Sequence, residues 1–465
     1  MLKHYKWLSV LLLTSCVNTV KNTASKMDDP WQQLQPILAQ IKAPQFPNKD
    51  FAITQYGAVG DGVTNCSKAI KAAIEKCNKA GGGRVVVPPG KYYTGPIYLK
   101  SNVNLHVQKG ATLLFSTKPD DYLPLVYTRW EGVELMNYSP LIYAYKEKNI
   151  AITGEGVLDG QANESNWWPW KGRTEYGWKA GTPSQTDSDK RAALFAMAEK
   201  NVPVADRKFG NGFYLRPQFV QPYSCENVLI EGVTIINSPM WILNPVLCNN
   251  VTIQKVTVES NGPNNDGCDP ESCKNVLIKE CYFNTGDDCI ALKSGRNADG
   301  RRINIPCENI VIQNCTMANG HGGVVIGSEI SGGAKNIFAE NCKMSSPELD
   351  RALRIKTNTA RGGIIENIYM RNIEVGQVKE EAVIMTMYYE DKGDFMPVIR
   401  NVEVKNMTVQ KGGRRGVVLE GYETSPVENV RFIDVTINNV PVPVKASHTK
   451  NISWVNSFIN GKKME

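Results

Sequence analysis

Two adjacent carboxylates, Asp287 and Asp288, stand in the stretch NTGDDCIALKSG, directly before an apolar run that predicts a buried strand. Two such groups at the mouth of a buried strand repel each other and resist desolvation. Crowded carboxylates do not all ionise at their usual pKa, so one of them is expected to stay protonated near neutral pH. A proton donor beside an ionised carboxylate is the pair of groups that cleavage of a glycosidic bond requires.

The chain around these residues repeats a short unit, in which Asn precedes a strand of alternating apolar and polar residues, as in NVLIEGVTI and NVTIQKVTV. The repeat residues are Asn227, Asn250, Asn275, Asn309, Asn336, Asn367, Asn401, Asn429 and Asn451, at separations of 22 to 34 positions. A variable period around short alternating strands predicts the coils of a solenoid with loops of differing length. Asn at the same turn of each coil would adopt the left-handed conformation and hydrogen-bond its stacked neighbour. We therefore expect an all-β protein, a parallel β-helix, whose repeat extends back to Asn149 and Asn102.

Coil spacing predicts which side chains lie beside the Asp pair. Asp287 follows the repeat residue Asn275 by 12 positions, and His321 follows Asn309 by the same 12. Both should therefore lie on adjacent coils, one above the other. Asp266 precedes Asp287 by 21 positions and belongs about one turn earlier. The spacing predicts three carboxylates and an imidazole on one outer face.

Cations and tyrosines follow on the next coils. Arg354 and Lys356 stand two positions apart in RALRIKT and so share one face of a strand, and Tyr388 and Tyr389 follow in MTMYYE. Arg and Lys beside the carboxylates would hold the acidic groups of a sugar polymer, Arg through a bidentate contact. A line of such groups along one face favours a chain-like substrate.

Each motif also has a simpler interpretation. The Asp pair could form a turn or a calcium site, His321 could be structural, and Arg354 with Lys356 could be solvated surface charge. Their coincidence on successive coils favours a functional site. One point conflicts with a shared site for Asp287 and Asp288. Strict alternation along a strand would send their side chains to opposite faces, unless Gly286 bends the chain.

At these residues the sequence resembles the polygalacturonases, glycoside hydrolase family 28. The resemblance rests on four motifs in order, NND at 264 to 266, GDD at 286 to 288, GHG at 320 to 322 and RIK at 354 to 356. It covers the chain from about residue 50 to about residue 460, including YGAVGDGVTN near the start. Asn265 stands where the family more often has Thr, and it leaves Asp266 in place.

The resemblance implies a right-handed parallel β-helix of the pectin-lyase type and hydrolysis of α-1,4-galacturonan with inversion. Asp287 would be the general acid, and Asp266 with Asp288 would hold and deprotonate the water. His321 would tune the protonation of the acid. The stretches KSGRNADGRR and GHGGVVIGSEISGG resemble the bacterial exo-acting members, which release units from a chain end.

The same resemblance implies a substrate site. Arg354 and Lys356 would bind the galacturonate carboxylate, Asn264 would contact the substrate, and so would one of Tyr388 and Tyr389. The expected partner is an acidic polysaccharide of the galacturonan or pectin type. Neither a metal, another cofactor nor a nucleic acid is expected.

Three other functions stay open on the sequence. A pectate lyase would share the β-helix but would need calcium and give unsaturated products, and His321 with the four ordered motifs counts against it. A rhamnogalacturonan or xylogalacturonan hydrolase would use the same residues, because the motifs determine the chemistry at the cut and not the neighbouring sugars. A non-catalytic adhesin would bind polysaccharide only, and binding alone does not require crowded carboxylates.

The first residues predict export. Lys3 and Lys6 precede an apolar run, and LLTSC then places small residues directly before Cys16. This pattern is typical of a lipoprotein signal over 1–15, with Cys16 lipidated, although a cleaved signal with an incidental Cys would look similar. We expect an outer-membrane lipoprotein on the periplasmic side, attached only by lipid through a tether over 16–45. Loss of the signal lowers the formal net charge from +7 to +5, a small excess compatible with an acidic polymer.

Residues 46–465 are expected to form one domain, closed at its first coil by a helix that ends at Gly81. One face of that helix carries Ala69, Ile70, Ala73, Ile74 and Cys77. The region at about 120–225 has little strand periodicity and predicts a long loop insertion, which could close one end of the groove and favour exo action. Its Trp167, Trp168 and Trp170 either pack within the loop or stack on a sugar. Most other cysteines stand at apolar strand positions, which predicts buried thiols rather than zinc ligands.

Overall fold

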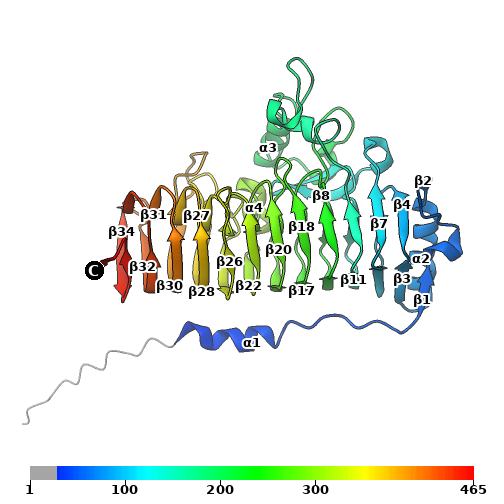
Figure 1. Ribbon diagram of the computed structural model, residues 1–465. Coiled ribbons are helices and arrows are strands. Elements are labelled where there is room, and N and C mark those ends of the chain that lie inside the picture. The colour runs from blue at the N-terminus through cyan, green and yellow to red at the C-terminus, as the bar shows by residue number, and fades with distance from the viewer. Residues whose placement is uncertain (1–28) are drawn as a thin grey trace, which may run out of the picture.

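Coils stack in register along one axis in the computed structural model, which describes residues 29–465 (Figure 1). Each strand pairs in parallel with the equivalent strand of the next coil, so the apolar positions of successive coils lie directly over one another. In the pair Val276 to Ile310, for example, both side chains are fully buried. The predicted parallel β-helix is confirmed.

Three rows of strands run along the axis. The first row consists of β1 (Asp50–Ala52), β3 (Gly83–Val87), β6 (Val103–Val107), β11 (Lys148–Gly154), β15 (Glu226–Glu231), β17 (Asn249–Gln254), β19 (Lys274–Lys279), β22 (Cys307–Gln313), β25 (Ala334–Glu340), β28 (Ile364–Gln377), β30 (Val398–Lys411), β32 (Val427–Ile437) and β34 (Thr449–Val455). The second consists of β2 (Asp61–Asn65), β4 (Gly90–Thr94), β7 (Ala111–Phe115), β12 (Val157–Asp159), β16 (Thr234–Ile236), β18 (Thr257–Ser260), β20 (Tyr282–Thr285), β23 (Thr316–Asn319), β26 (Lys343–Met344), the later halves of β28, β30 and β32, and β35 (Phe458–Ile459).

The third row lies on the side of the molecule that carries the candidate site. It consists of β5 (Ile97–Tyr98), β10 (Ile142–Tyr145), β14 (Val220–Tyr223), β21 (Ile290–Leu292), β24 (Val324–Ile326), β27 (Arg351–Lys356), β29 (Glu381–Thr386), β31 (Arg415–Glu420) and β33 (Val442–Ser447). Single bridges through Leu243 and Cys268 join β14 to β21 and make the row continuous.

The repeat asparagines form a ladder along the first row. Asn309, for example, has a φ of 57° and donates from Nδ2 to Oδ1 of Asn275 at 3.0 Å. Asn336 donates in turn to Asn309 at 3.1 Å, and the pattern continues to Asn451. Both predicted features of these residues, the left-handed backbone and the hydrogen bond to the neighbouring coil, are confirmed, except that Asn275 donates to Asn249 and not to the repeat residue Asn250. Each bond fixes the register of one coil on the next.

The two ends of the stack are closed differently. Helix α2 (Ser67–Lys79) covers the first coils with the predicted apolar face, and Gly81 with a φ of 86° follows its end. At the other end, β36 (Lys462–Lys463) folds back antiparallel onto β35. Among residues 29–465, no helix is both long and apolar enough to span a bilayer. The eleven cysteines in this range are all buried and free, as predicted for most of them.

The region at 120–225 is not one long loop as expected. Strands β10, β11 and β12 form part of a regular coil within it and divide it into two excursions, which rise above the stack in Figure 1. The first contains η3 (Pro119–Tyr122) and the hairpin of β8 (Val126–Trp130) and β9 (Val133–Asn137). The second contains η4 (Trp168–Lys171), η5 (Thr174–Tyr176), α3 (Arg191–Glu199), η6 (Val204–Asp206) and β13 (Lys208–Phe209), which pairs with β9. Both share a small apolar core.

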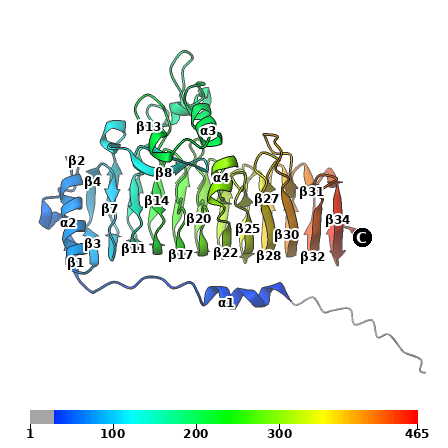
Figure 2. The ribbon, with the colours of Figure 1, turned by 180° about the vertical axis from the view of Figure 1, so that it is seen from behind.

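The expectation that residues 16–45 form only a tether is also partly wrong. Residues from η1 (Pro30–Gln33) and α1 (Leu34–Leu38) onward run along the outside of the first row, beneath the stack in both views (Figures 1 and 2). Trp31 packs on Phe338 at a centroid distance of 5.5 Å, and its Nε1 donates to Glu403. Lys42 exchanges two hydrogen bonds with Asn250. We call residues 29–49 the strap. Cys16 and the predicted signal lie outside the described residues.

Candidate active site

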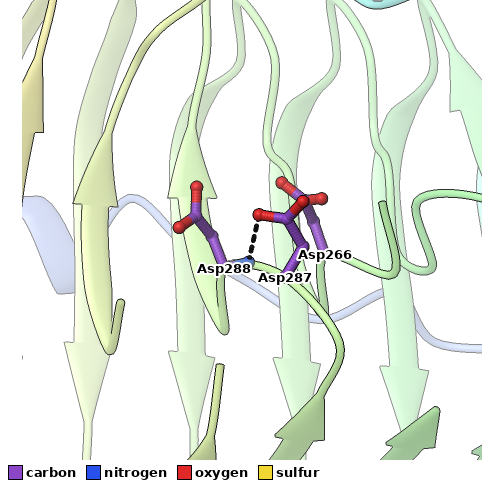
Figure 3. Close-up of side chains that lie close together, drawn as sticks. All are labelled: Asp266, Asp287 and Asp288. Atoms are coloured by element: carbon purple, nitrogen blue, oxygen red, sulfur yellow. Dashed lines mark hydrogen bonds between the residues drawn. The ribbon is translucent and has the colours of Figure 1, made fainter. Parts of the chain in front are cut away.

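One corner of three successive coils, where a second-row strand turns into the third row, carries the candidate acid and base groups. Asp266 follows β18, Asp287 and Asp288 lie between β20 and β21, and His321 lies between β23 and β24. Figure 3 shows the three carboxylates gathered at this corner. Their nearest oxygen atoms lie within 4.8 Å of one another, so the predicted cluster is confirmed.

Both aspartates reach this corner because they stand in a turn and not in a strand. Strand β20 ends at Thr285 and β21 begins at Ile290, so strict alternation does not apply between them. Gly286 allows the turn to approach the previous coil, since a Cβ there would lie 2.3 Å from the carbonyl oxygen of Gly262. The backbone N of Asp288 donates to Oδ1 of Asp287 at 3.0 Å (Figure 3).

Asp287 pairs with His321 across adjacent coils. Nδ1 of His321 lies 2.9 Å from Oδ1 of Asp287, and the backbone N of His321 donates to the carbonyl of Asp287 at 3.0 Å. The hydrogen bond and the charge of Asp287 raise the pKa of His321 to about 9. Burial alone would raise the pKa of Asp287, but the hydrogen bond and charge of His321 hold it well below its usual value. This pair therefore holds one proton between neutral pH and about pH 9.

Asp288 is paired with both cations of the RIK motif. Nζ of Lys356 lies 2.7 Å from Oδ2 of Asp288, and Nη1 of Arg354 lies 3.4 Å from Oδ1. The Asp288 side chain is only 1% exposed, so burial opposes its charge, yet the two cations keep its pKa below the usual value. Asp288 is therefore an ionised carboxylate in a fixed position.

Asp266 contacts a cation that sequence reasoning missed. Nζ of Lys293 lies 3.3 Å from Asp266, 3.3 Å from Glu329 and 3.8 Å from Asp269, and 4.4 Å from the ring centre of Trp241. Burial and the charge of Asp287 raise the pKa of Asp266 to about 8 despite this ammonium group. Asp266 is therefore the member of the cluster whose pKa agrees with the prediction that one carboxylate stays protonated.

This distribution of protons bears on the role of Asp287. A general acid must carry a proton, whereas His321 holds the pKa of Asp287, the residue that the resemblance assigns to this role, well below its usual value. The reason is the 2.9 Å contact with His321, which stabilises a carboxylate at Asp287. The proton available at this position is therefore that of the Asp287 and His321 pair.

The carboxylate cluster does not fit calcium. Three crowded carboxylates could bridge a cation, but the ammonium groups of Lys356 and Lys293 already lie 2.7 Å from Asp288 and 3.3 Å from Asp266. A divalent ion between the same oxygens would be repelled by both. The donor set thus favours chemistry without a metal.

The structure separates the two tyrosines. Tyr389 lines the cleft, with its ring centre 5.2 Å from Nζ of Lys356 and 5.4 Å from the Arg354 guanidinium. Tyr388 turns away, because its hydroxyl donates to the carbonyl of Gly421 and its ring packs on Tyr422. Tyr388 is therefore not a residue of the cleft.

Packing also decides the role of the three tryptophans. Trp167 is 1% exposed and packs on Tyr122 and Trp170, and Trp168 donates from Nε1 to the carbonyl of Ser238. They are packing residues of the second excursion. The aromatic side chains of the cleft are instead Trp241, Tyr176 and Tyr389.

The cleft has a volume of about 440 Å³, and most of the residues that line it are charged. Asn264 lies at its edge, where its Oδ1 accepts from Nζ of Lys171 at 2.7 Å and from Nη2 of Arg216 at 2.8 Å. The excursions add Glu131, Lys171, Arg173, Tyr176 and Arg191 to the lining. Sequence reasoning missed these residues because no repeat aligns them with the coils. Lys293 was detectable, since it directly follows β21, the short third-row strand that Asp288 precedes.

Crowded carboxylates paired with an imidazole, in a cleft on a parallel β-helix that also carries several Arg and Lys side chains, are typical of a glycosidase that acts on an acidic polymer. Comparison with known proteins gives the family. The model for glycosyl hydrolases family 28 matches residues 204–458, and one for rhamnogalacturonase A/epimerase, pectate lyase-like, matches 51–107. The chain belongs to glycosyl hydrolases family 28.

Individual relatives of the chain support the same family. The exopolygalacturonase structure from Thermotoga maritima is 46% identical, with a TM-score of 0.91 over 94% of this chain and 97% of that one. An exo-poly-alpha-D-galacturonosidase of Dickeya chrysanthemi is 30% identical over 82% of this chain and 66% of its own length. An endo-polygalacturonase of Pectobacterium carotovorum is 27% identical over 86% of this chain and 88% of its own length.

Proposed function

We propose that this protein hydrolyses α-1,4-galacturonosidic bonds of polygalacturonate and releases single units from a chain end. The observation that carries the proposal is the proton-holding pair of Asp287 and His321, placed beside Asp288 and its two cations. An acidic sugar would complement the cations of the cleft. The extensive likeness to the exo-acting relatives supports the exo mode, and so do the excursion residues that line one part of the cleft.

The residues divide the reaction as follows. The leaving oxygen of the glycosidic bond takes the proton held by the Asp287 and His321 pair, through the carboxyl of Asp287. A water molecule attacks the anomeric carbon and gives its proton to ionised Asp288, while protonated Asp266 orients that water. Arg354, Lys356 and Tyr389 contact the sugar on the far side of the cluster.

The restraint on Asp288 supports inversion of configuration. Retention needs a carboxylate that bonds directly to the anomeric carbon. Asp288 is 1% exposed and paired with two cations, so it is poorly placed to reach a sugar carbon but well placed to accept a proton from water. The nearest oxygen atoms of the three carboxylates lie within 4.8 Å of one another, a spacing that by itself would also suit retention. The anomer of the product therefore tests inversion directly.

The function is tested by digesting polygalacturonate in the presence of a chelator and separating the products over time. We expect saturated monogalacturonate from the earliest time point, with no absorbance from unsaturated ends. Mixed oligomers at early times would refute the exo mode. Unsaturated products that vanish with chelator would instead identify a lyase.

We also propose that the protein is exported as an outer-membrane lipoprotein on the periplasmic side, lipidated at Cys16. The support is the signal pattern that ends in LLTSC. Mass spectrometry of the mature N-terminus should find a lipid on Cys16, and Cys16→Ser should release the protein from membranes. An unmodified N-terminus at another residue would contradict the proposal.

A further inference from the structure

Two cations beside the active site have no acidic partner. Lys171 and Arg216 both donate to the neutral amide oxygen of Asn264, at 2.7 and 2.8 Å. Among residues 29–465, no carboxylate oxygen lies within 4.0 Å of either side chain, whereas Arg191, close by, is paired with Glu131 at 2.6 Å. The charge of Glu131 acts on both cations from a longer distance, but Glu131 is itself paired with Arg191, so neither Lys171 nor Arg216 has an ion-pair partner of its own.

Burial makes this arrangement costly. Arg216 is fully buried behind Asn264, where it also donates to the backbone carbonyls of Pro239 and Pro263. Burial lowers the pKa of Lys171 to about 8 and that of Arg216 to about 10. Buried cations are normally paired with an anion, so a buried Arg216 and a half-buried Lys171, neither in an ion pair, suit an anion from outside the chain.

The position of these cations relative to the reacting groups matters. Asn264 belongs to the same coil as Asp266, whereas Arg354 lies in β27, beyond the coil of His321. The two cationic groups therefore stand on opposite sides of the carboxylates along the axis. Lys171 comes from η4 of the second excursion, and it lines the cleft together with Arg173 and Tyr176 of the same segment.

We propose that Lys171, supported by Arg216 behind Asn264, binds the carboxylate of the terminal galacturonate that is released, while Arg354 and Lys356 bind the carboxylate of the next sugar. On the proposed function, on which this assignment rests, Lys171 and Arg216 would select an acidic sugar at the chain end. The ammonium group supplies the charge, and Asn264 holds it in place. A terminal sugar without a carboxylate would leave both cations unpaired.

The test compares galacturonate with galactose as inhibitors of trigalacturonate cleavage. Galacturonate should inhibit the wild type far more strongly than galactose. Lys171→Met should weaken inhibition by galacturonate about a hundredfold and lower kcat/KM by a similar factor, because it leaves the sugar carboxylate without its partner. Lys171→Arg should restore part of the inhibition by galacturonate and part of kcat/KM. Lys179→Met, at an exposed lysine of the same excursion outside the cleft, is the matched control and should behave as the wild type.

Two outcomes would overturn the inference: equal inhibition by the two sugars, or an unchanged inhibition constant in Lys171→Met. Calorimetry of galacturonate binding to the wild type and to Lys171→Met requires no turnover. Tight, Lys171-dependent binding by a protein that fails to cleave polygalacturonate would refute the proposed function and leave this site standing. Normal cleavage of polygalacturonate together with galacturonate binding that does not depend on Lys171 would refute this inference and leave the proposed function standing.

Discussion

Replacing Lys356 by Met removes the closest cation from the candidate base. Its Nζ lies 2.7 Å from Oδ2 of Asp288, and the two side chains are 7% and 1% exposed. Met has a similar length and keeps the apolar contacts of the side chain. The substitution therefore isolates the effect of the charge and of one charge-assisted hydrogen bond.

Removing one partner of a buried ion pair costs about 3 to 5 kcal/mol, because the other charge stays buried without compensation. Arg354 remains 3.4 Å from Asp288 and offsets part of this loss, so we expect a decrease of about 2 to 3 kcal/mol in the free energy of unfolding at pH 7. Loss of the Lys356 charge also raises the pKa of Asp288, because burial then opposes ionisation with one cation fewer to offset it.

The sign of the pH dependence follows from the depressed pKa of Asp288 in the folded protein. Its stabilising contribution is present above the unfolded pKa of about 3.9 and is lost as the pH falls through the lower folded pKa. In Lys356→Met the contribution shrinks, so the stability difference from the wild type should be full at pH 7 and vanish at strongly acidic pH.

Urea unfolding at several pH values and the pH profile of kcat at saturating substrate measure both effects. The acid limb of kcat should move towards neutral pH, because the base must be ionised and its pKa is raised. Lys343→Met is a suitable control, since Lys343 is 70% exposed and lies 3.7 Å from Glu374 on the surface. An unmoved acid limb, with stability equal to that of the control, would refute the assignment of Asp288.

Three further outcomes are expected. Asp266→Asn should reduce activity at least about a hundredfold. The raised pKa of Asp266 makes the free energy of unfolding fall as the pH rises from about 4 to about 8, so Asp266→Asn should also flatten this pH dependence. An equal slope for wild type and variant in urea unfolding would contradict this. Trp31→Ala should free the strap from Phe338, Arg371 and Glu403. Hydrogen exchange over residues 29–49 should then become faster, with little change in kcat. Unchanged exchange would show that other contacts hold the strap. Extensive dialysis against EDTA should leave activity unchanged, since Lys293 and Lys356 compensate the carboxylates, and recovery only on adding calcium would overturn that reasoning.

Features governed by local spacing were predictable from the sequence. Asn309 bonds to Asn275 and His321 contacts Asp287 because each pair occupies equivalent positions on adjacent coils, so counting residues along the repeat was sufficient. The buried face of α2 followed from helical periodicity in the same way. In a solenoid, sequence position converts directly into position along the axis.

Features governed by packing between distant segments were not predictable. Nothing in MTMYYE distinguishes Tyr389, which faces the cleft, from Tyr388, which packs on Tyr422. The strap docks because Trp31 meets Glu403, 372 positions away. The protonation of the cluster depends on which carboxylate has the nearer cation, and so on distances that no spacing rule supplies. Lys171 reaches Asn264 from an excursion without any repeat.

The most direct test of the account is the anomer of the first product released from trigalacturonate, recorded by proton NMR for the wild type and for Asp287→Asn. The account predicts the β-anomer of galacturonate before mutarotation in the wild type, and at least about a thousandfold slower release by Asp287→Asn with the fold intact. The α-anomer as first product would contradict water attack assisted by Asp288. Undiminished release by Asp287→Asn would contradict the role of the Asp287 and His321 pair as the proton donor.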